Sequence, residues 1–416
     1  MAELYEVGDI EERVILVGVS TSDGDDTEES LDELEELAKT AGAVTVAKVI
    51  QNREAYHPGT YIGKGKIEEL KELAGHLEAT GIVCDDELTP AQIKNLEDAL
   101  QLKVIDRTVM ILDIFAARAN TKEGKIQVEL AQLRYRSTRL IGLGNSLSRL
   151  GGGIGTRGPG EKKLEVDRRL IKDRISILKR ELEGVKQTRE TIRLKRQKNP
   201  VPVVAIVGYT NAGKSTLLNT LTNANVLEED KLFATLDPTT RNLELESGQQ
   251  ILLTDTVGFI RKLPHHLIEA FKSTLEEAKY ADIILHVVDV SNPQADKQMH
   301  IVYETLEQLG VKDKPIITAF NKQDRLEQPV VMKDLKADKT VKISAKQKDG
   351  LPMLLETIET VLKEQKVFVE KVIPYKEAGI IQTIRKYGQL ITEEYREDGI
   401  FVRAYVPKEI YHQIIL

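Results

Sequence analysis

The most constraining feature of the sequence is an apolar run, Val203-Val204-Ala205-Ile206-Val207, followed at once by Gly208-Tyr209-Thr210-Asn211-Ala212-Gly213-Lys214-Ser215. The second stretch has the form GxxxxGK[ST], and a strand that leads through such a turn into a helix is a P-loop. Its backbone N–H groups, lysine and serine surround a nucleoside triphosphate and its magnesium ion. The pattern predicts an α/β domain with a triphosphate site and leaves the base open.

Three further motifs follow, each at the end of a strand-like run. Asp255-Thr256-Val257-Gly258 supplies a carboxylate for magnesium, through water, and a glycine N–H that can approach the γ-phosphate. Asn321-Lys322-Gln323-Asp324 ends on a carboxylate that can accept from N1–H and the exocyclic amine of guanine, and adenine has no matching pair of donors. Ser344-Ala345-Lys346 puts a backbone N–H near guanine O6. The ordered set predicts GTP and GDP as the ligands.

These motifs resemble those of translation-factor-type GTPases. The segment Phe233-Ala234-Thr235-Leu236-Asp237-Pro238-Thr239-Thr240-Arg241 is expected to hold the threonine that binds magnesium when the γ-phosphate orders the loop. The match to related GTPases favours Thr235 over Thr239 or Thr240.

The residue after Gly258 is Phe259, where many GTPases carry the glutamine that orients the attacking water. Because phenylalanine cannot hydrogen-bond water, hydrolysis by the isolated protein is expected to be slow, below ~10⁻² s⁻¹. Asn211 resembles the asparagine that helps to hold a potassium ion in several such GTPases. A partner could also supply the missing geometry, and Arg241 and Arg261 are conceivable arginine fingers, although a surface or structural role is the simpler interpretation of each.

The predicted site falls into overlapping sets. Lys214, Thr235, Gly258 and Asn211 are assigned catalytic parts, while Ser215, Thr235 and Asp255 are assigned to Mg²⁺, with potassium as a second candidate cation. The full GTP-binding set is Gly208, Tyr209, Thr210, Asn211, Ala212, Gly213, Lys214, Ser215, Thr216, Phe233, Ala234, Thr235, Leu236, Asp237, Asp255, Thr256, Val257, Gly258, Asn321, Lys322, Asp324, Ser344, Ala345 and Lys346.

The 416 residues are enough for several domains, and the predicted fold class is multidomain α/β. Residues 1–120 alternate between strand and helix patterns, which favours a small α/β domain. Its expected strands are 13–19, 44–51, 81–85 and 103–106, and its expected helices are 30–41, 66–77, 90–100 and 108–119. Within it, Gly63-Lys64-Gly65-Lys66 is either a weak anion site before a helix or an ordinary turn.

Residues 121–199 have a helical period that predicts two long helices in an antiparallel hairpin. From Arg118 to Lys198 there are 22 Lys or Arg against 9 Asp or Glu, a balance of +13 within a chain of net charge −7. This indicates either a solvated helical surface or a contact with a polyanion such as RNA. The glycine-rich loop at 150–160 is either a flexible tip or a loop that orders on nucleic acid, with Arg149, Arg157, Lys162 and Lys163 as the expected RNA contacts.

Asn199-Pro200-Val201-Pro202 ends the helical segment and opens the GTPase domain, expected over 200–365 as a doubly wound sheet. The last segment, 366–416, is expected to be an α+β module of strand, helix, hairpin and terminal helix, with Asp398-Gly399 marking the hairpin. The expected GTPase-domain strands are 203–207, 250–254, 283–288, 315–320 and 340–343.

The chain has one cysteine, Cys84, which excludes an intrachain disulfide and is expected to be a small buried residue. The N-terminus is acidic where a signal peptide is basic and apolar, and no apolar run approaches the ~18 residues that a membrane span needs. We expect a cytoplasmic protein without a membrane span.

With these motifs, the chain resembles the HflX family of GTPases over nearly its whole length. The residues that carry the resemblance are Tyr61–Leu70, Glu87–Gln92, Val104–Thr108, the Gly151–Lys163 loop and the GTPase motifs with Phe233–Arg241. The resemblance implies an N-terminal α/β domain joined by a helical hairpin to a GTPase domain. It also implies association with the large ribosomal subunit and its RNA, and in some members the splitting of ribosomes stalled by heat or stress.

Three functions remain open on these grounds. The first is a monomeric, GTP-switched factor that splits or recycles ribosomes and whose hydrolysis the ribosome stimulates. The second is a GTP-dependent RNA-binding or assembly factor that does no splitting. The third is a signalling GTPase with protein partners only, and the basic segment argues against it. Some relatives also hydrolyse ATP through the N-terminal domain, for which Gly63–Lys66 is the only candidate here.

Overall fold

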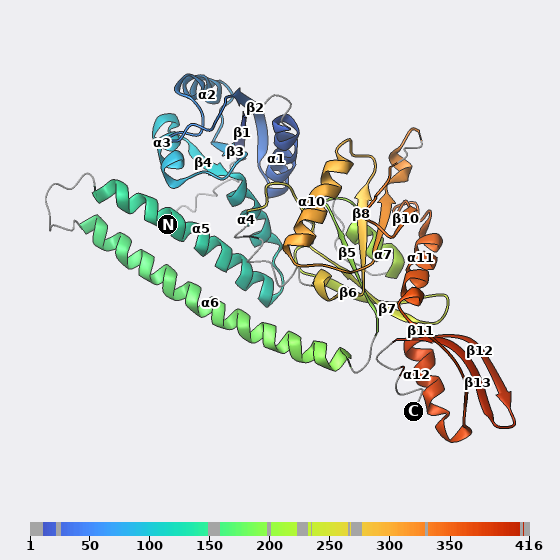
Figure 1. Cartoon of the computed structure of the whole chain (residues 1–416). Helices are drawn as coiled ribbons and strands as arrows, with labels where there is room; N and C mark the ends of the chain where they lie inside the picture. The colour runs from blue at the N-terminus through green and yellow to red at the C-terminus, as the bar shows by residue number, and fades with distance from the viewer. Residues whose placement is uncertain are drawn as a thin grey trace, which may run out of the picture. The chain divides into compact units, whose positions relative to one another are not determined.

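A computed structural model describes most of the chain: residues 11–21, 26–148, 159–197, 201–222, 232–233, 235–264, 267, 277–328, 332–407 and 411. Side chains of 141–148, 159–164, 186 and 189–197 are not described. The chain forms two compact units (Figure 1). The first comprises Met1–Glu183 together with Arg261–Ala270, and the second comprises Gly184–Ile260 together with Phe271–Leu416.

The first unit is built on a parallel sheet of order β2-β1-β3-β4. Its central strands are almost wholly apolar, so both faces need cover from helices. The bounds of these elements are β1 Arg13–Ser20, α1 Thr27–Ala41, β2 Val44–Asn52, α2 Lys64–His76, β3 Gly81–Cys84, α3 Pro90–Leu100, β4 Lys103–Asp106 and α4 Arg107–Arg118. The strands and helices expected from the sequence are confirmed, with ends within three residues.

The start of α3 shows how the sequence sets these ends. The Thr89 side chain accepts from the Gln92 backbone N–H, and the Gln92 side chain accepts from the Thr89 N–H at 2.9 Å. This capping box satisfies two N–H groups that the first turn of a helix leaves without partners. Pro90 occupies the first helical position, where its missing N–H costs nothing. The cap therefore fixes the residue at which α3 begins, shortly after the end of β3.

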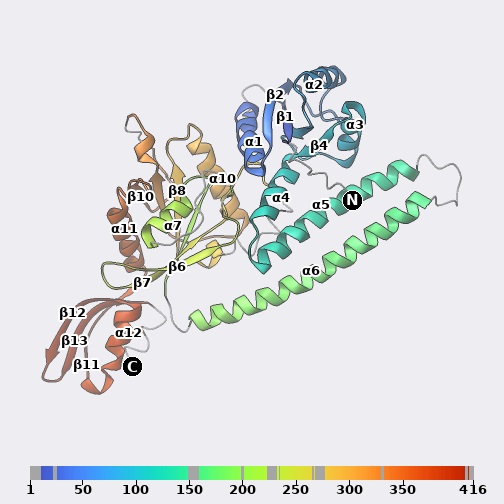
Figure 2. The ribbon, with the colours of Figure 1, turned by 180° about the vertical axis from the view of Figure 1, so that it is seen from behind.

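Two long helices, α5 (Lys122–Ser148) and α6 (Pro159–Gln197), run antiparallel side by side (Figures 1 and 2). Ile126, Leu130 and Leu178 are buried between them, and Arg174 forms a two-bond ion pair with Glu129 at 2.7 and 2.9 Å. The hairpin predicted from the helical period is therefore confirmed. The expected glycine-rich tip, including Arg149 and Arg157, lies outside the described residues.

The second unit contains a six-stranded sheet of order β10-β9-β8-β5-β7-β6. The element bounds are β5 Val203–Gly208, α7 Lys214–Thr222, β6 Thr239–Glu244, β7 Gln250–Asp255, β8 Ile283–Asp289, α10 Ala295–Gln308, β9 Ile316–Asn321, β10 Lys339–Lys342 and α11 Leu351–Glu364. All neighbours pair in parallel except the edge strand β6, which is antiparallel to β7. The sequence gives no sign of β6 because Leu243 is its only apolar residue.

A three-stranded antiparallel sheet, ordered β11-β13-β12, follows in the same unit. The bounds are β11 Val367–Ile373, α12 Gly379–Tyr387, β12 Gln389–Arg396 and β13 Gly399–Val406. The hairpin predicted at Asp398-Gly399 is confirmed, and Gly399 has φ +150°, where a side chain would meet the Ile373 carbonyl. The expected terminal helix falls on residues that are, apart from Tyr411, outside the description.

Two smaller predictions can be checked directly. Cys84 is buried at the end of β3, as a small apolar residue would be. Within the described residues, no helix is both long enough and apolar enough to cross a membrane.

Candidate nucleotide site

A cleft of about 310 Å³ opens at the carboxyl ends of β5, β7 and β9. This is the place where open parallel sheets bind ligands, because the chain leaves the neighbouring strands β5 and β8 in opposite directions, from β5 toward β7 and from β8 toward β9. Every lining residue except Arg325 belongs to the set predicted from the sequence. The lining consists of Thr210, Asn211, Gly213, Lys214, Ser215, Thr216, Phe233, Thr235, Thr256, Gly258, Asn321, Lys322, Asp324, Arg325, Ala345 and Lys346.

The P-loop wraps around Lys214, the first residue of α7. Its ammonium is buried and donates to the Tyr209 carbonyl at 2.7 Å. Burial lowers the Lys214 pKa to about 8, with Lys322 adding to the effect and Asp255 opposing it. Gly213 has φ +96°, and a side chain there would come within 2.3 Å of the Asn321 amide. The loop therefore presents a cation and backbone N–H groups to an anion.

Three oxygen groups meet at one end of the cleft, two of them on lining residues and the third, on Asp255, behind these. The Ser215 hydroxyl lies 2.8 Å from the Thr235 hydroxyl and donates to Asp255 Oδ2 at 2.8 Å. Asp255 is fully buried, and its Oδ1 has no hydrogen-bond partner within the described part of the chain. Burial raises the Asp255 pKa, although Lys214 pulls it down. Mg²⁺ prefers such oxygen ligands, so the donor set fits this ion, which would favour the charged carboxylate.

Thr235, rather than its neighbours, occupies that position. Thr239 and Thr240 lie in β6, and the Thr240 hydroxyl is 3.0 Å from that of Thr254. The structure thus brings the favoured threonine beside the P-loop serine, in the arrangement expected when a γ-phosphate orders the loop.

The loop after β7 is fixed to the P-loop. The Phe259 N–H donates to the Gly208 carbonyl at 3.1 Å, and the Thr210 N–H donates to the Phe259 carbonyl at 2.8 Å. Gly258 lines the cleft, and a Cβ there would lie 3.0 Å from Lys214 Nζ. The Phe259 side chain is 2% exposed and is absent from the lining. It is therefore packed into the protein rather than held over the phosphates.

The opposite end of the cleft is braced for base recognition. Asn321 donates to the Ala212 carbonyl at 2.9 Å and accepts from the Ala345 N–H at 2.9 Å. Ser344 donates to Asp324 Oδ1 at 2.5 Å, which orients the carboxylate. These bonds tie the base-recognition loops to the P-loop.

Lys322 adds a further tie between these loops. It donates to the Asn211 carbonyl at 2.8 Å and pairs with Asp289 at 2.7 Å. Asp289 ends β8 and was missed in the sequence, as was Arg325; their positions beside a strand end and beside Asp324 were the available signals.

The remaining members of the predicted set do not line the cleft. Ala234 lies outside the described residues. Tyr209, Ala212 and Ser344 act from behind through the bonds already described. The residues of the set that are described but do not line the cleft are Gly208, Tyr209, Ala212, Leu236, Asp237, Asp255, Val257 and Ser344.

Several other candidates can also be placed. Arg241 is exposed on β6, whereas Arg261 pairs with Asp26 and is 11% exposed, which supports the structural interpretation for Arg261. The Gly63 N–H donates to Gln51 at 2.8 Å and Lys66 pairs with Glu69 at 2.7 Å, so this turn is already internally bonded. Lys162 and Lys163 lie in α6, but their side chains are outside the description.

Three family models match the chain in succession. Residues 28–116 match the GTP-binding GTPase N-terminal model, residues 118–196 the GTP-binding GTPase middle region, and residues 203–322 the 50S ribosome-binding GTPase model.

Curated relatives match nearly end to end. The chain is 71% identical over 411 residues to the GTPase HflX of Lacrimispora saccharolytica, covering 99% of this chain and 97% of the relative. It is 40% identical to the GTPase HflX of Escherichia coli, covering 96% and 93%. Among solved structures, a GTP-binding protein from Sulfolobus solfataricus in complex with GDP is 25% identical with a TM-score of 0.45, covering 85% of this chain and 99% of the other.

Proposed function

The chain belongs to the HflX family of GTPases, and from that premise we propose that it binds the large ribosomal subunit in its GTP state and splits or recycles ribosomes under stress. The GTPase model that it matches is itself described as 50S ribosome-binding. We propose that the chain has four domains, residues 1–120, 121–199, 200–365 and 366–416, and that it acts as a cytoplasmic monomer.

The observation that carries the ribosome proposal is the basic hairpin. Within a chain of net charge −7, the 118–198 segment has a balance of +13. On α6, one basic side chain after another is exposed: Arg168, Arg169, Lys172, Lys179 and Arg180. Lysines and arginines in such numbers neutralise RNA phosphates and release counterions, so binding should weaken steeply with salt. Arg149, Arg157, Lys162 and Lys163, the RNA contacts expected from the sequence, are four further cations of the same segment.

The cleft supports the switch half of the proposal. Lys214 would neutralise phosphate charge, and the Gly258 N–H would detect the γ-phosphate. Ser215, Thr235 and, through water, the Asp255 carboxylate would hold Mg²⁺, which would supply positive charge against the phosphates. The buried Phe259 leaves the attacking water without a side chain from this position. We therefore propose slow hydrolysis alone, stimulation by the large subunit, and assistance from potassium held near Asn211.

Gradient sedimentation tests the splitting activity. Intact ribosomes incubated with the protein and a non-hydrolysable GTP analogue should separate into subunits, with the protein on the large one. If the ribosomes stay whole while the protein cosediments, a GTP-dependent binding or assembly factor is the better description. If nothing cosediments at any salt concentration, ribosome binding is wrong.

Hydrolysis rates test the switch. GTP turnover should rise on addition of large subunits and should be higher in potassium than in sodium. Fast turnover by the isolated protein in sodium, indifferent to subunits, contradicts the roles given to Phe259 and Asn211.

Charge reversal tests the hairpin surface. The fourfold variant Arg149→Glu, Arg157→Glu, Lys162→Glu, Lys163→Glu should lose cosedimentation and flatten its salt dependence, while GTP affinity stays unchanged. A matched control reverses four exposed lysines elsewhere in the chain: Lys71, Lys297, Lys312 and Lys376. Equal losses in the two variants would show a general charge effect and would remove support for a specific RNA contact.

A further inference from the structure

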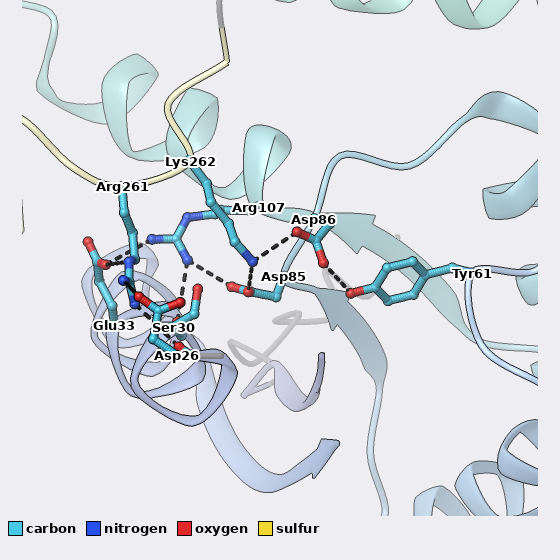
Figure 3. Close-up of polar contacts among 9 residues, drawn as sticks. All are labelled: Asp26, Ser30, Glu33, Tyr61, Asp85, Asp86, Arg107, Arg261 and Lys262. Carbon is cyan, nitrogen blue, oxygen red and sulfur yellow. Dashed lines mark hydrogen bonds and ion pairs between the residues drawn. The ribbon is translucent and has the colours of Figure 1, made fainter. Parts of the chain in front are cut away.

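The chain directly after Gly258 leaves the unit that contains the nucleotide cleft. Ile260 belongs to the second compact unit, whereas Arg261–Ala270 belongs to the first. Arg261 and Lys262, which the nucleotide chemistry does not use, therefore lie among residues of the N-terminal α/β domain (Figure 3).

Both cations meet carboxylates there. Lys262 Nζ forms ion pairs with Asp85 and, at 2.8 Å, with Asp86. Arg261 pairs with Asp26 and lies 3.8 Å from Glu33. Figure 3 shows the side chains of Arg261 and Lys262 reaching from their loop into this group of acids.

The acids are already organised by their own domain. Asp85 is fully buried at the end of β3 and accepts from Arg107 at 2.8 Å, and Arg107 also pairs with Glu33 at 3.2 Å. Tyr61 donates to Asp86 at 2.6 Å. These bonds join Asp85, Asp86 and Glu33 to side chains of their own domain.

The charge balance of this cluster needs the two cations. We call the group Asp26, Glu33, Asp85, Asp86 and Arg107 the acidic cluster. It has four carboxylates and one arginine, a net charge of −3, which Arg261 and Lys262 reduce to −1. Although burial would raise the Asp85 pKa, Arg107 and Lys262 hold it below its ordinary value, so the group is charged. Removing the two cations would return these five residues to a net charge of −3, with the Asp85 carboxylate buried, and a buried carboxylate that loses opposing charge is costly.

The link from this cluster back to the nucleotide is short and stiff. Only Phe259 and Ile260 separate Gly258 from Arg261, and each is 2% exposed. Three residues span at most about 10 Å when extended, so Gly258 has little freedom once Arg261 is held. Lys262 has φ +52°, a left-handed conformation that non-glycine residues adopt only where their surroundings enforce it.

We propose that Arg261 and Lys262 are positioning residues, whose ion pairs with the acidic cluster hold the Gly258 loop where it receives the γ-phosphate. The pairs coexist with a Thr235 hydroxyl 2.8 Å from Ser215, the arrangement of the magnesium-binding groups expected with a triphosphate. The acidic cluster thereby favours GTP over GDP. The inference concerns the isolated chain, so it stands or falls independently of ribosome binding.

The test compares nucleotide affinities in neutralised variants that keep side-chain size. Lys262→Gln should raise the Kd of a non-hydrolysable GTP analogue about tenfold, within the usual range of coupling between sites, and change the GDP Kd less than about twofold. Asp86→Asn keeps an acceptor for Tyr61 and should give a smaller effect of the same kind. The double variant should be no worse than Lys262→Gln alone, because both changes remove one interaction.

Conservative and distant variants separate positioning from general stability. Lys262→Arg keeps the positive charge and should show the same ratio of GDP Kd to analogue Kd as the parent protein. Lys48→Gln with Asp32→Asn removes an ion pair of 2.6 Å on the same domain and should leave the ratio unchanged. Arg261→Gln provides an independent variant should Lys262→Gln fold poorly. Equal losses of GDP and analogue affinity, or additive effects in the Lys262 and Asp86 cycle, would overturn the proposal.

Discussion

Replacing Phe259 by glutamine tests how this GTPase handles its attacking water. If slow hydrolysis were due only to the lack of a hydrogen-bonding side chain at this position, Phe259→Gln would introduce the residue that many GTPases use and would raise GTP turnover. The structure predicts otherwise, because the side chain is 2% exposed and does not line the cleft. We expect kcat within about threefold of the parent, since a side chain packed in the interior cannot reach the water.

The expected cost is in stability. Burying a phenylalanine side chain contributes about 1.5–3 kcal/mol, and most of this is lost in the variant. The new amide would lie in the same buried space without partners, at a further cost of about 1–3 kcal/mol. Together these predict a loss of about 2.5–6 kcal/mol in the free energy of unfolding, a large part of the 5–15 kcal/mol typical of a domain.

Urea unfolding without nucleotide and single-turnover hydrolysis measure the two quantities. Phe259→Leu is the matched control, because it keeps the site apolar and should cost only about 1–2 kcal/mol. A tenfold or greater rise in kcat for Phe259→Gln, with unfolding unchanged, would refute the reasoning and place the side chain over the nucleotide.

Three further predictions concern the same unit. Asp324→Asn removes the carboxylate proposed to accept two charge-assisted hydrogen bonds from guanine, so competition binding should show GTP affinity reduced about 10²- to 10⁴-fold. Thr235→Ala removes a proposed magnesium ligand and should weaken analogue binding about tenfold in a magnesium titration while sparing GDP. Burial lowers the His286 pKa to about 4 from 6.5, so the native state binds fewer protons. Between pH 6.5 and 4 the free energy of unfolding should fall by up to about 3 kcal/mol more than in His286→Gln, as urea midpoints would show.

The sheet and the motifs were predictable because they are local. β5 is an uninterrupted apolar run, and β8 is apolar from Ile283 to Val288 except for His286. The chemical motifs follow directly at strand ends, so pattern and position agree. β6 escaped prediction because it is an exposed edge strand whose polar residues are held by pairing with β7 rather than by burial. Arg325 escaped because one cation beside Asp324 has no distinguishing pattern.

The ion pairs between residues far apart in the chain could not be predicted from the sequence, for a different reason. Asp85 and Lys262 are 177 residues apart, and Asp26 and Arg261 are 235 apart. In the sequence, Asp85 is an ordinary polar residue at the end of a strand, and Arg261 and Lys262 are an ordinary pair of cations shortly after a motif. Only the fold places the end of β3 beside Arg261 and Lys262. The opposite charges of the two groups then attract each other.

The four residues after Gly258 form a buried apolar pair followed by a pair of cations, and both pairs restrict the movement of this loop. Phe259 and Ile260 are buried, while Arg261 and Lys262 are bound to carboxylates, so this stretch is held at both ends. A loop held in this way cannot swing a side chain toward the γ-phosphate without exposing apolar surface and breaking ion pairs, each of which is costly. An activator of hydrolysis therefore has two routes: it supplies the water-orienting group from outside, or it competes for the acidic cluster and frees the loop. The first route leaves the Lys262→Gln variant fully responsive to activation, whereas the second makes that variant insensitive, and the two can be told apart by its stimulated rate.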